Sequence, residues 1–209
     1  MKLIPKTPGI VKFILSGYIW DIKTHEKSIY LTFDDGPTPF ITNWVLDELS
    51  KYNAKATFFC IGKNVKTHPE IYKRIIEEGH STGNHTFDHV KGWKTSVEEY
   101  IENTKKTAEL VNSNLFRPPY GKITIPQGWA LKKLGYKIIM WDVVAVDWDC
   151  KLDSETTYNN VINYTAPGSI IVFHDSVKAE KNMKYALTKV LEYFTKKGYT
   201  FKCIPAKVL

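Results

Sequence analysis

A regular alternation between short apolar segments and longer amphipathic segments is the feature that most constrains how this chain folds. Short apolar runs bounded by turn residues predict strands, and a helical spacing of apolar residues predicts helices. Three of the helical segments end in the same kind of turn, in which a glycine (Gly79, Gly135 or Gly198) precedes the next strand. Strands are predicted at 28–33, 56–60, 79–84, 114–117, 137–142, 169–174 and 199–202. Helices are predicted at 41–52, 68–78, 96–112, 125–134, 154–164 and 179–197.

Repeated strand–helix units of this kind predict one α/β domain with a parallel sheet. A chain of 209 residues is long enough to bury one large core and short for two. The sheet could close as a (β/α) barrel or stay open as a doubly wound sheet, and either topology gathers the C-terminal ends of the strands on one face. Residues 1–27 do not follow the alternation, because Pro5, Pro8 and Gly9 interrupt them. We expect them to form an arm on the outside of a catalytic domain that spans residues 28–209.

The composition narrows the range of partners. The formal net charge is +7, but the lysines are scattered and no aromatic RNA-binding pattern accompanies them, so no nucleic-acid partner is expected. Three widely spaced cysteines argue against a disulfide framework or a cysteine metal site, and Cys60 is predicted to be a core residue. No apolar stretch is long enough for a membrane span or a secretory signal. The chain as given is therefore expected to be cytoplasmic, or secreted or in the cell envelope if a leader was removed; the oligomeric state stays open.

Two pairs of polar residues carry the strongest chemical signal. Asp34 and Asp35 follow the apolar run 28–31 and precede a Gly-Pro turn, so a buried strand delivers two adjacent acids that need a cation. His85 and His89 have HxxxH spacing, which lets both imidazoles face one point if the segment turns helically. Two imidazoles and one carboxylate leave a metal ion with open positions for water and substrate.

Further reactive residues come at or just beyond the ends of other predicted strands. Arg117 lies in Arg-Pro-Pro-Tyr-Gly, Asp147 precedes Trp148, and His174 precedes Asp175. In a parallel α/β fold, residues at these places converge on one active site although they are far apart in sequence. His80, at the start of the strand that leads to His85, is a candidate for a supporting position behind the metal ligands.

With these motifs in order, TFDDGP, HTFDH, RPPYG, the DW dipeptide and the strand-end HD, the chain resembles the polysaccharide deacetylase family over residues 28–202. This is the NodB-homology family, or carbohydrate esterase family 4. The resemblance implies a distorted (β/α) barrel with about seven parallel strands. It also implies a divalent metal, usually Zn²⁺ with Co²⁺ or Ni²⁺ as alternatives, held by Asp35, His85 and His89.

The same resemblance implies roles for the remaining motif residues. Asp34 would be the general base that takes a proton from the attacking water, and Arg117 would pair with Asp34. The backbone N–H of Tyr120 would stabilise the oxyanion, on a turn that the preceding prolines stiffen. His174, oriented by Asp147, would be the general acid that protonates the leaving amine. Trp148, Ile171 and Val172 would shape a pocket for the acetyl methyl group, although core packing explains them equally well.

One position departs from the family pattern. The first acid of the usual Asp-x-x-Asp-Trp motif is replaced by Val144, while Asp142 lies two residues earlier.

The substrate that we expect is an N-acetylated glycan, either peptidoglycan or chitooligosaccharide, that loses acetate. An O-acetyl xylan esterase, a deacetylase of a small acetylated amine, and a catalytically silent carbohydrate-binding relative are the alternatives. Trp93 would stack on a sugar ring if it is exposed, and core packing is the other reading.

Overall fold

The structure is a computed structural model, and it describes residues 4–205. Its strands are β1 (Ser28–Asp34), β2 (Ala56–Cys60), β3 (Ser81–Asn84), β4 (Leu115–Phe116), β5 (Lys137–Ile138), β6 (Val143–Val144), β7 (Ile170–His174) and β8 (Thr200–Phe201). Its α-helices are α1 (Gly9–Ile14), α2 (Ile41–Ser50), α3 (Gly62–Thr67), α4 (Pro69–Glu77), α5 (Val97–Ala108), α6 (Ile125–Lys133), α7 (Ser154–Ile162) and α8 (Glu180–Lys196). Two short 3₁₀ turns, η1 (Gly92–Lys94) and η2 (Pro119–Gly121), complete the elements.

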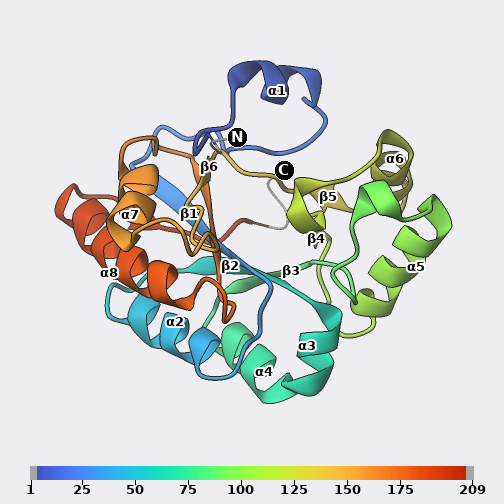
Figure 1. Ribbon diagram of the computed structural model, residues 1–209, viewed down its shortest axis with the longest axis horizontal. Helices are drawn as coiled ribbons and strands as arrows, with labels where there is room; N and C mark the ends of the chain where they lie inside the picture. The colour runs from blue at the N-terminus through green and yellow to red at the C-terminus, as the bar shows by residue number, and fades with distance from the viewer. Residues whose placement is uncertain (1–3, 206–209) are drawn as a thin grey trace.

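The strands form one parallel sheet in the order β5-β4-β3-β2-β1-β7-β6, and β8 pairs with the start of β1. This confirms the predicted parallel α/β fold. Helices cover the outside of the sheet, with α7 and α8 on one side, α2, α3 and α4 below it, and α5 and α6 on the other side (Figure 1). No helix within residues 4–205 is long and apolar enough to cross a membrane.

The sheet curls until its two edges approach each other. The predicted strand at 137–142 is wrong as a single element, because β5 and β6 lie at opposite edges of the sheet. The connection from Ile138 to Val143 can span no more than roughly 18 Å, so the two edges must come close together. The result is a barrel that stays open between β5 and β6.

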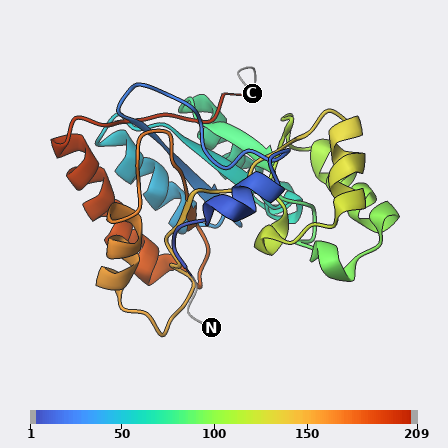
Figure 2. The same cartoon turned by 90° about the horizontal axis from the view of Figure 1, so that it is seen from above.

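The N-terminal segment lies along this opening. Ile19 forms a bridge with Ile139, Lys6 with Val143, and Asp21 with Ser169. Helix α1 stands above the sheet in Figure 1 and crosses the middle of the molecule when it is seen from above (Figure 2). The ammonium groups of Lys6 and Lys12 each lie 2.6 Å from a carboxylate oxygen of the buried Asp142. These ion pairs fix the segment to the residues that connect the two edges of the sheet.

Alternation along the central strands separates the core from the site. In β1, Ile29, Leu31 and Phe33 join the main core under the helices, whereas Thr32 and Asp34 point to the opposite face and bind Arg117. This follows from the two-residue period of an extended strand. The neighbouring β7 is in register, with Asp34 beside His174 at the C-terminal end. Cys60 is fully buried in the main core, as predicted.

Candidate active site

Asp34 is held by a fully buried arginine. Nη1 of Arg117 lies 2.7 Å from Oδ1 of Asp34 and also donates to Oγ1 of Thr32. The rest of the guanidinium donates to the carbonyl oxygens of Ile139 and Met140. Because these contacts fix Arg117 on both sides, they fix Oδ1 of Asp34 as well. The other carboxylate oxygen of Asp34 receives no hydrogen bond from residues 4–205, so it is free to accept a proton.

The adjacent Asp35 faces the two histidines. One ligand atom from each of Asp35, His85 and His89 can be chosen so that all three lie within 4.8 Å of one another. Oδ1 of Asp35 is 3.2 Å from Nε2 of His89 and 3.7 Å from Nε2 of His85. The sequence therefore predicted three residues that the structure brings together at one point.

The protonation states of this cluster fit a divalent cation. Burial would raise the pKa of Asp35, but its hydrogen bond with His89 and the nearby histidines hold that pKa well below its usual range. Burial lowers the pKa of His85 to about 4, so its imidazole is neutral. Nδ1 of His85 lies 2.8 Å from the carbonyl oxygen of Arg117, to which it donates, and this leaves the Nε2 lone pair directed at Asp35. One carboxylate and two imidazoles are a typical donor set for Zn²⁺ or a similar ion.

His85 and His89 do not lie on a helix. Their HxxxH spacing was expected to bring the two imidazoles together only if the segment turned helically. Residues 85–89 form a loop in which Thr86 and His89 have positive φ angles of 61° and 55°. Asn103 on α5 holds this loop, since its Oδ1 accepts hydrogen bonds from the backbone N–H groups of Phe87 and Asp88. The structure brings together the two histidines that the HxxxH spacing singled out, but it does so through a loop and not through a helix.

His174 is oriented by Asp147. Its Nδ1 lies 2.8 Å from Oδ1 of Asp147, and its backbone N–H donates to the other carboxylate oxygen. Burial would lower the pKa of His174, but the charge of Asp147 and this hydrogen bond raise it to about 9. His174 is therefore a cation at neutral pH, and its Nε2–H can be donated. The rings of Trp148 and His174 pack edge to face, with centroids 4.7 Å apart.

Tyr120 lies beside the second metal-site histidine. Its ring centroid is 4.5 Å from that of His89, and its side chain is half exposed. Its backbone has a positive φ of 59°, directly after the buried Pro118 and Pro119. The Tyr120 N–H donates to no acceptor among residues 4–205, so it is free to bind a ligand oxygen.

The predicted methyl pocket is only partly formed by the residues proposed for it. Val172 lies on the same face as His174, is buried, and packs with Val144, Val146 and Trp148. Ile171 points to the opposite face and belongs to the main core, as the alternation of β7 requires. It therefore cannot line the pocket, and that part of the prediction is wrong.

Asp142, the acid nearest to Val144 in the fourth motif, has a structural role. It accepts hydrogen bonds from Lys6, Lys12 and Oγ of Ser169. Val144 at the motif position is buried in the apolar cluster around Trp148. Asp142 thus anchors the N-terminal segment.

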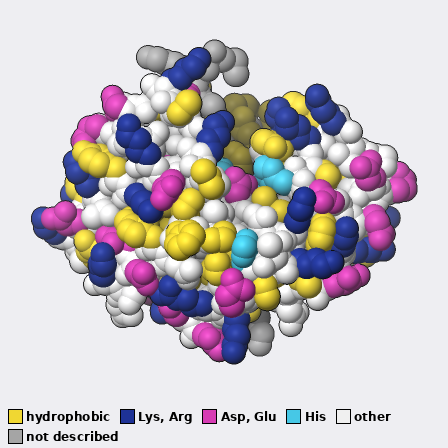
Figure 3. Space-filling view, turned by 60° about the horizontal axis from the view of Figure 1, so that its bottom comes forward, with side chains coloured by type: hydrophobic (Ala, Val, Ile, Leu, Met, Phe, Trp, Pro, Cys, Tyr) yellow, Lys and Arg dark blue, Asp and Glu magenta, His cyan; other side chains and the backbone are white. Residues whose placement is uncertain are grey.

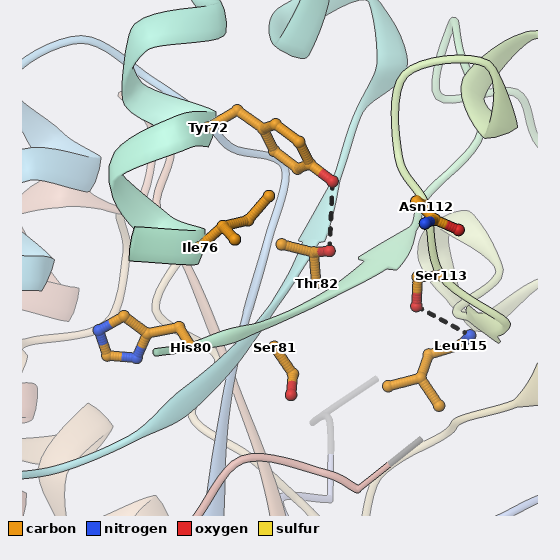
Figure 4. Close-up of a pocket in the computed structure, with 8 residues that line it drawn as sticks. All are labelled: Tyr72, Ile76, His80, Ser81, Thr82, Asn112, Ser113 and Leu115. Atoms are coloured by element: carbon orange, nitrogen blue, oxygen red, sulfur yellow. Dashed lines mark hydrogen bonds between the residues drawn. The ribbon is translucent and has the colours of Figure 1, made fainter. Parts of the chain in front are cut away.

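His80 is not behind the metal ligands. It precedes β3, at the opposite end of that strand from Asn84 and His85, and its Nδ1 accepts a hydrogen bond from the Ala56 N–H. With Tyr72, Ile76 and Ser81 it borders a cavity of about 350 Å³ at this remote end (Figure 4). A strand of this length separates its two ends by roughly 13 Å, which explains why the predicted supporting role is wrong.

Sequence reasoning missed one buried acid that orders the site. Oδ1 of Asp175 accepts the Gly36 N–H, and Oδ2 accepts the hydroxyl of Thr42. A Cβ on Gly36 would lie 2.0 Å from this carboxylate, so only glycine fits there. The strand-end HD dipeptide contained the signal, but only the structure shows that its acid clamps the turn that follows Asp35.

Comparison with known proteins identifies the family. A profile of the polysaccharide deacetylase family matches residues 21–139, more than half of the chain. The chain belongs to the polysaccharide deacetylase family. A Bacillus cereus peptidoglycan-N-acetylglucosamine deacetylase is 37% identical over 195 residues, which cover 89% of this chain and 91% of that protein. The peptidoglycan-N-acetylmuramic acid deacetylase PdaC of Bacillus subtilis is 33% identical over 184 residues, 85% of this chain and 38% of that protein.

A solved structure of this polysaccharide deacetylase family has the same fold. The Bc1960 peptidoglycan N-acetylglucosamine deacetylase superposes with a TM-score of 0.86 at 34% identity, over 95% of each chain. The curled parallel sheet is thus shared across nearly the whole length of both chains. On the face that Figure 3 presents, basic and acidic side chains are interspersed, and histidines lie near its middle beside acidic and hydrophobic groups.

Proposed function

We propose that the protein is a metal-dependent deacetylase that removes N-acetyl groups from amino sugars of peptidoglycan and releases acetate. The observation that carries this proposal is that two groups of polar residues come together at the ends of adjacent strands. Asp34 ends β1 and Asp35 follows it, and His174 ends the neighbouring β7 in register with Asp34. A base, a cation site and an acid therefore surround one point.

A divalent cation held by Asp35, His85 and His89, for which we propose Zn²⁺, would supply Lewis-acid chemistry that activates water and polarises the acetyl carbonyl. Asp34 would accept the proton of the attacking water on its free oxygen, while Arg117 keeps its other oxygen in place. The Tyr120 N–H would donate to the oxyanion that develops on the acetyl carbonyl.

Collapse of the tetrahedral intermediate requires protonation of the nitrogen, because an amide anion is a poor leaving group. His174 would donate its Nε2 proton to that nitrogen, and the Asp147 carboxylate would stabilise the charged imidazole until then. Trp148 packs edge to face with His174 and would restrict the orientation of the imidazole ring. Amine and acetate then leave as separate products.

Three alternatives use the same site. Chitooligosaccharide, acetylxylan and a small acetylated amine all present an acetyl group that this arrangement could cleave. Peptidoglycan is preferred because the relatives described above carry that substrate in their names. A silent carbohydrate-binding protein is disfavoured, since the chain keeps Asp34, Asp35, His85, His89 and His174 together.

The test is acetate release from peptidoglycan, N-acetylglucosamine oligomers and acetylxylan. Metal-stripped protein is compared with protein reloaded with Zn²⁺, Co²⁺ or Ni²⁺. We expect metal-dependent release from peptidoglycan above that from acetylxylan. Release from acetylxylan alone would favour the esterase, and binding of glycan without any release would favour the silent relative.

A further inference from the structure

Unusual backbone angles are concentrated around the site. Among residues 4–205, seven non-glycine residues have φ in the left-handed region: Asp35, Phe40, Asn53, Thr86, His89, Tyr120 and Val146. Five of these are site residues or their direct neighbours, because Thr86 follows His85 and Val146 precedes Asp147. Asn53 is an asparagine in a turn, where this conformation is well tolerated. Phe40 is the one position that neither the site nor its residue type explains.

Phe40 combines backbone strain with full exposure. Its φ and ψ are 64° and −42°, and it is 85% exposed, the largest exposed fraction among the large apolar residues within 4–205. A bulky side chain in this region of φ costs free energy. Side-chain packing does not offset this free-energy cost, because the ring is almost entirely in solvent. Strain that side-chain packing does not offset is typical of functional positions.

The loop that presents Phe40 is tied to both catalytic strand ends. It leaves β1 after Asp34, and Asp175 clamps it by accepting hydrogen bonds from Gly36 and Thr42. Asp175 directly follows His174, the acid at the end of β7. The turn that carries Phe40 is therefore held against the end of the strand that carries the acid. Val177, 75% exposed, is the apolar residue that follows on the β7 side of this clamp.

We propose that Phe40 is a substrate-binding residue on which a sugar ring of the glycan stacks, next to the acetylated unit. The proposal rests on the proposed function and deepens it, because it implies a polymer rather than a small acetylated amine. The flat apolar face of a phenyl ring is complementary to the face of a pyranose that carries only C–H groups. An exposed aromatic group beside polar catalytic groups is a common feature of ligand-binding grooves.

Four variants test the proposal: Phe40→Ala, Phe40→Gly, Phe40→Trp and the control Phe13→Ala. Phe13 is 78% exposed and lies on α1, at the other end of the molecule from α2 in Figure 1. For zinc-loaded protein acting on N-acetylglucosamine oligomers, Phe40→Ala and Phe40→Gly should raise KM about tenfold and leave kcat unchanged. Phe40→Trp should keep the wild-type KM, and Phe13→Ala should have no effect. Activity on the monosaccharide should be the same in all four.

Thermal unfolding tests the strain separately. At positive φ, Phe40→Gly should be more stable than Phe40→Ala, with a Tm about 2–4 °C higher. At position 13, within a helix, the order should reverse, so that Phe13→Ala is more stable than Phe13→Gly. An unchanged oligomer KM in Phe40→Ala, or a Phe40→Gly that unfolds below Phe40→Ala, would overturn the inference.

A failure of the proposed function gives a different result. If wild-type protein loaded with zinc releases no acetate from any glycan, oligomer affinity is measured directly by NMR titration of chitohexaose. A tenfold weaker Kd for Phe40→Ala than for wild type would still support the stacking role. Equal affinities, or no binding by wild type, would overturn it.

Discussion

Asp34 and Asp35 are neighbours in sequence, yet their side chains meet different partners. The alternation of β1 turns Asp34 toward Arg117, while the positive φ of Asp35 turns its carboxylate toward His85 and His89. One acid is thus neutralised by a buried cation and the other belongs to the metal-site cluster. This difference would allow one dipeptide to supply both the base and the metal ligand of the proposed mechanism.

Replacing Asp34 by Asn separates these roles. Asp34→Asn should keep one zinc per chain and lose about 10²–10⁴-fold in kcat, because the amide cannot take the proton from water. Zinc content by atomic absorption and acetate release are the two measurements. The matched variant Asp35→Asn should lose zinc as well as activity. Near-normal turnover in Asp34→Asn would contradict its assignment as the base.

The charge of His174 depends on Asp147. In metal-stripped protein the pKa of His174, followed by NMR, should be about 9 and should fall toward 6.5 in Asp147→Asn. Since the folded-state pKa lies above the unfolded value, this pair stabilises the fold fully below about pH 6.5 and loses its contribution as the pH rises through about 9. Wild type should therefore lose more stability than Asp147→Asn between pH 7 and pH 10. The same pH dependence in both proteins would count against the pairing.

Loops rather than helices or strands set the geometry of the proposed metal site at Asp35, His85 and His89. The loop 85–89 is held by one side chain of α5, Asn103, which accepts two backbone hydrogen bonds. Asn103→Ala should weaken zinc binding about 10–100-fold, because the loop that carries His89 loses two of its backbone hydrogen bonds. The control is Glu102→Ala, which changes an exposed neighbour on the same helix. Equal zinc affinity in Asn103→Ala and Glu102→Ala, measured with a competing chelator, would show that the loop holds without this contact.

The N-terminal segment depends on Asp142. Asp142→Ala removes the acceptor of Lys6, Lys12 and Ser169 and should lower the free energy of unfolding by about 1–3 kcal/mol. Limited proteolysis should then cut first within residues 4–20. Asp21→Ala, which removes the more exposed partner of Lys12, should have a smaller effect. A wild-type digestion pattern in Asp142→Ala would mean that the bridges of Ile19 and Asp21 suffice.

For the whole molecule, the sequence predicted the order of elements well because local signals define them. Glycine turns such as Gly135 and apolar runs such as 170–173 depend only on nearby residues. The division of 137–142 between two sheet edges was not predictable, since the run Lys-Ile-Ile-Met has the pattern of one strand and only the curvature of the sheet separates its ends.

The site was predictable to a similar extent. Motif residues such as Asp35 and His174 could be named from their positions at strand ends. Their supports could not, because Asn103 and Asp175 act through backbone groups that come close only in the fold. Phe40 carries no sequence signal at all, as its strain and exposure are properties of the folded loop.

The most direct test of this account is a zinc titration of the metal-stripped protein during acetate release from peptidoglycan. Activity should rise linearly to one equivalent of zinc per chain and then stay constant, and His89→Ala should show no such rise, because it lacks one of the three ligands. Full acetate release before zinc is added, or none after one equivalent is bound, would contradict a zinc-dependent deacetylase built on Asp35, His85 and His89.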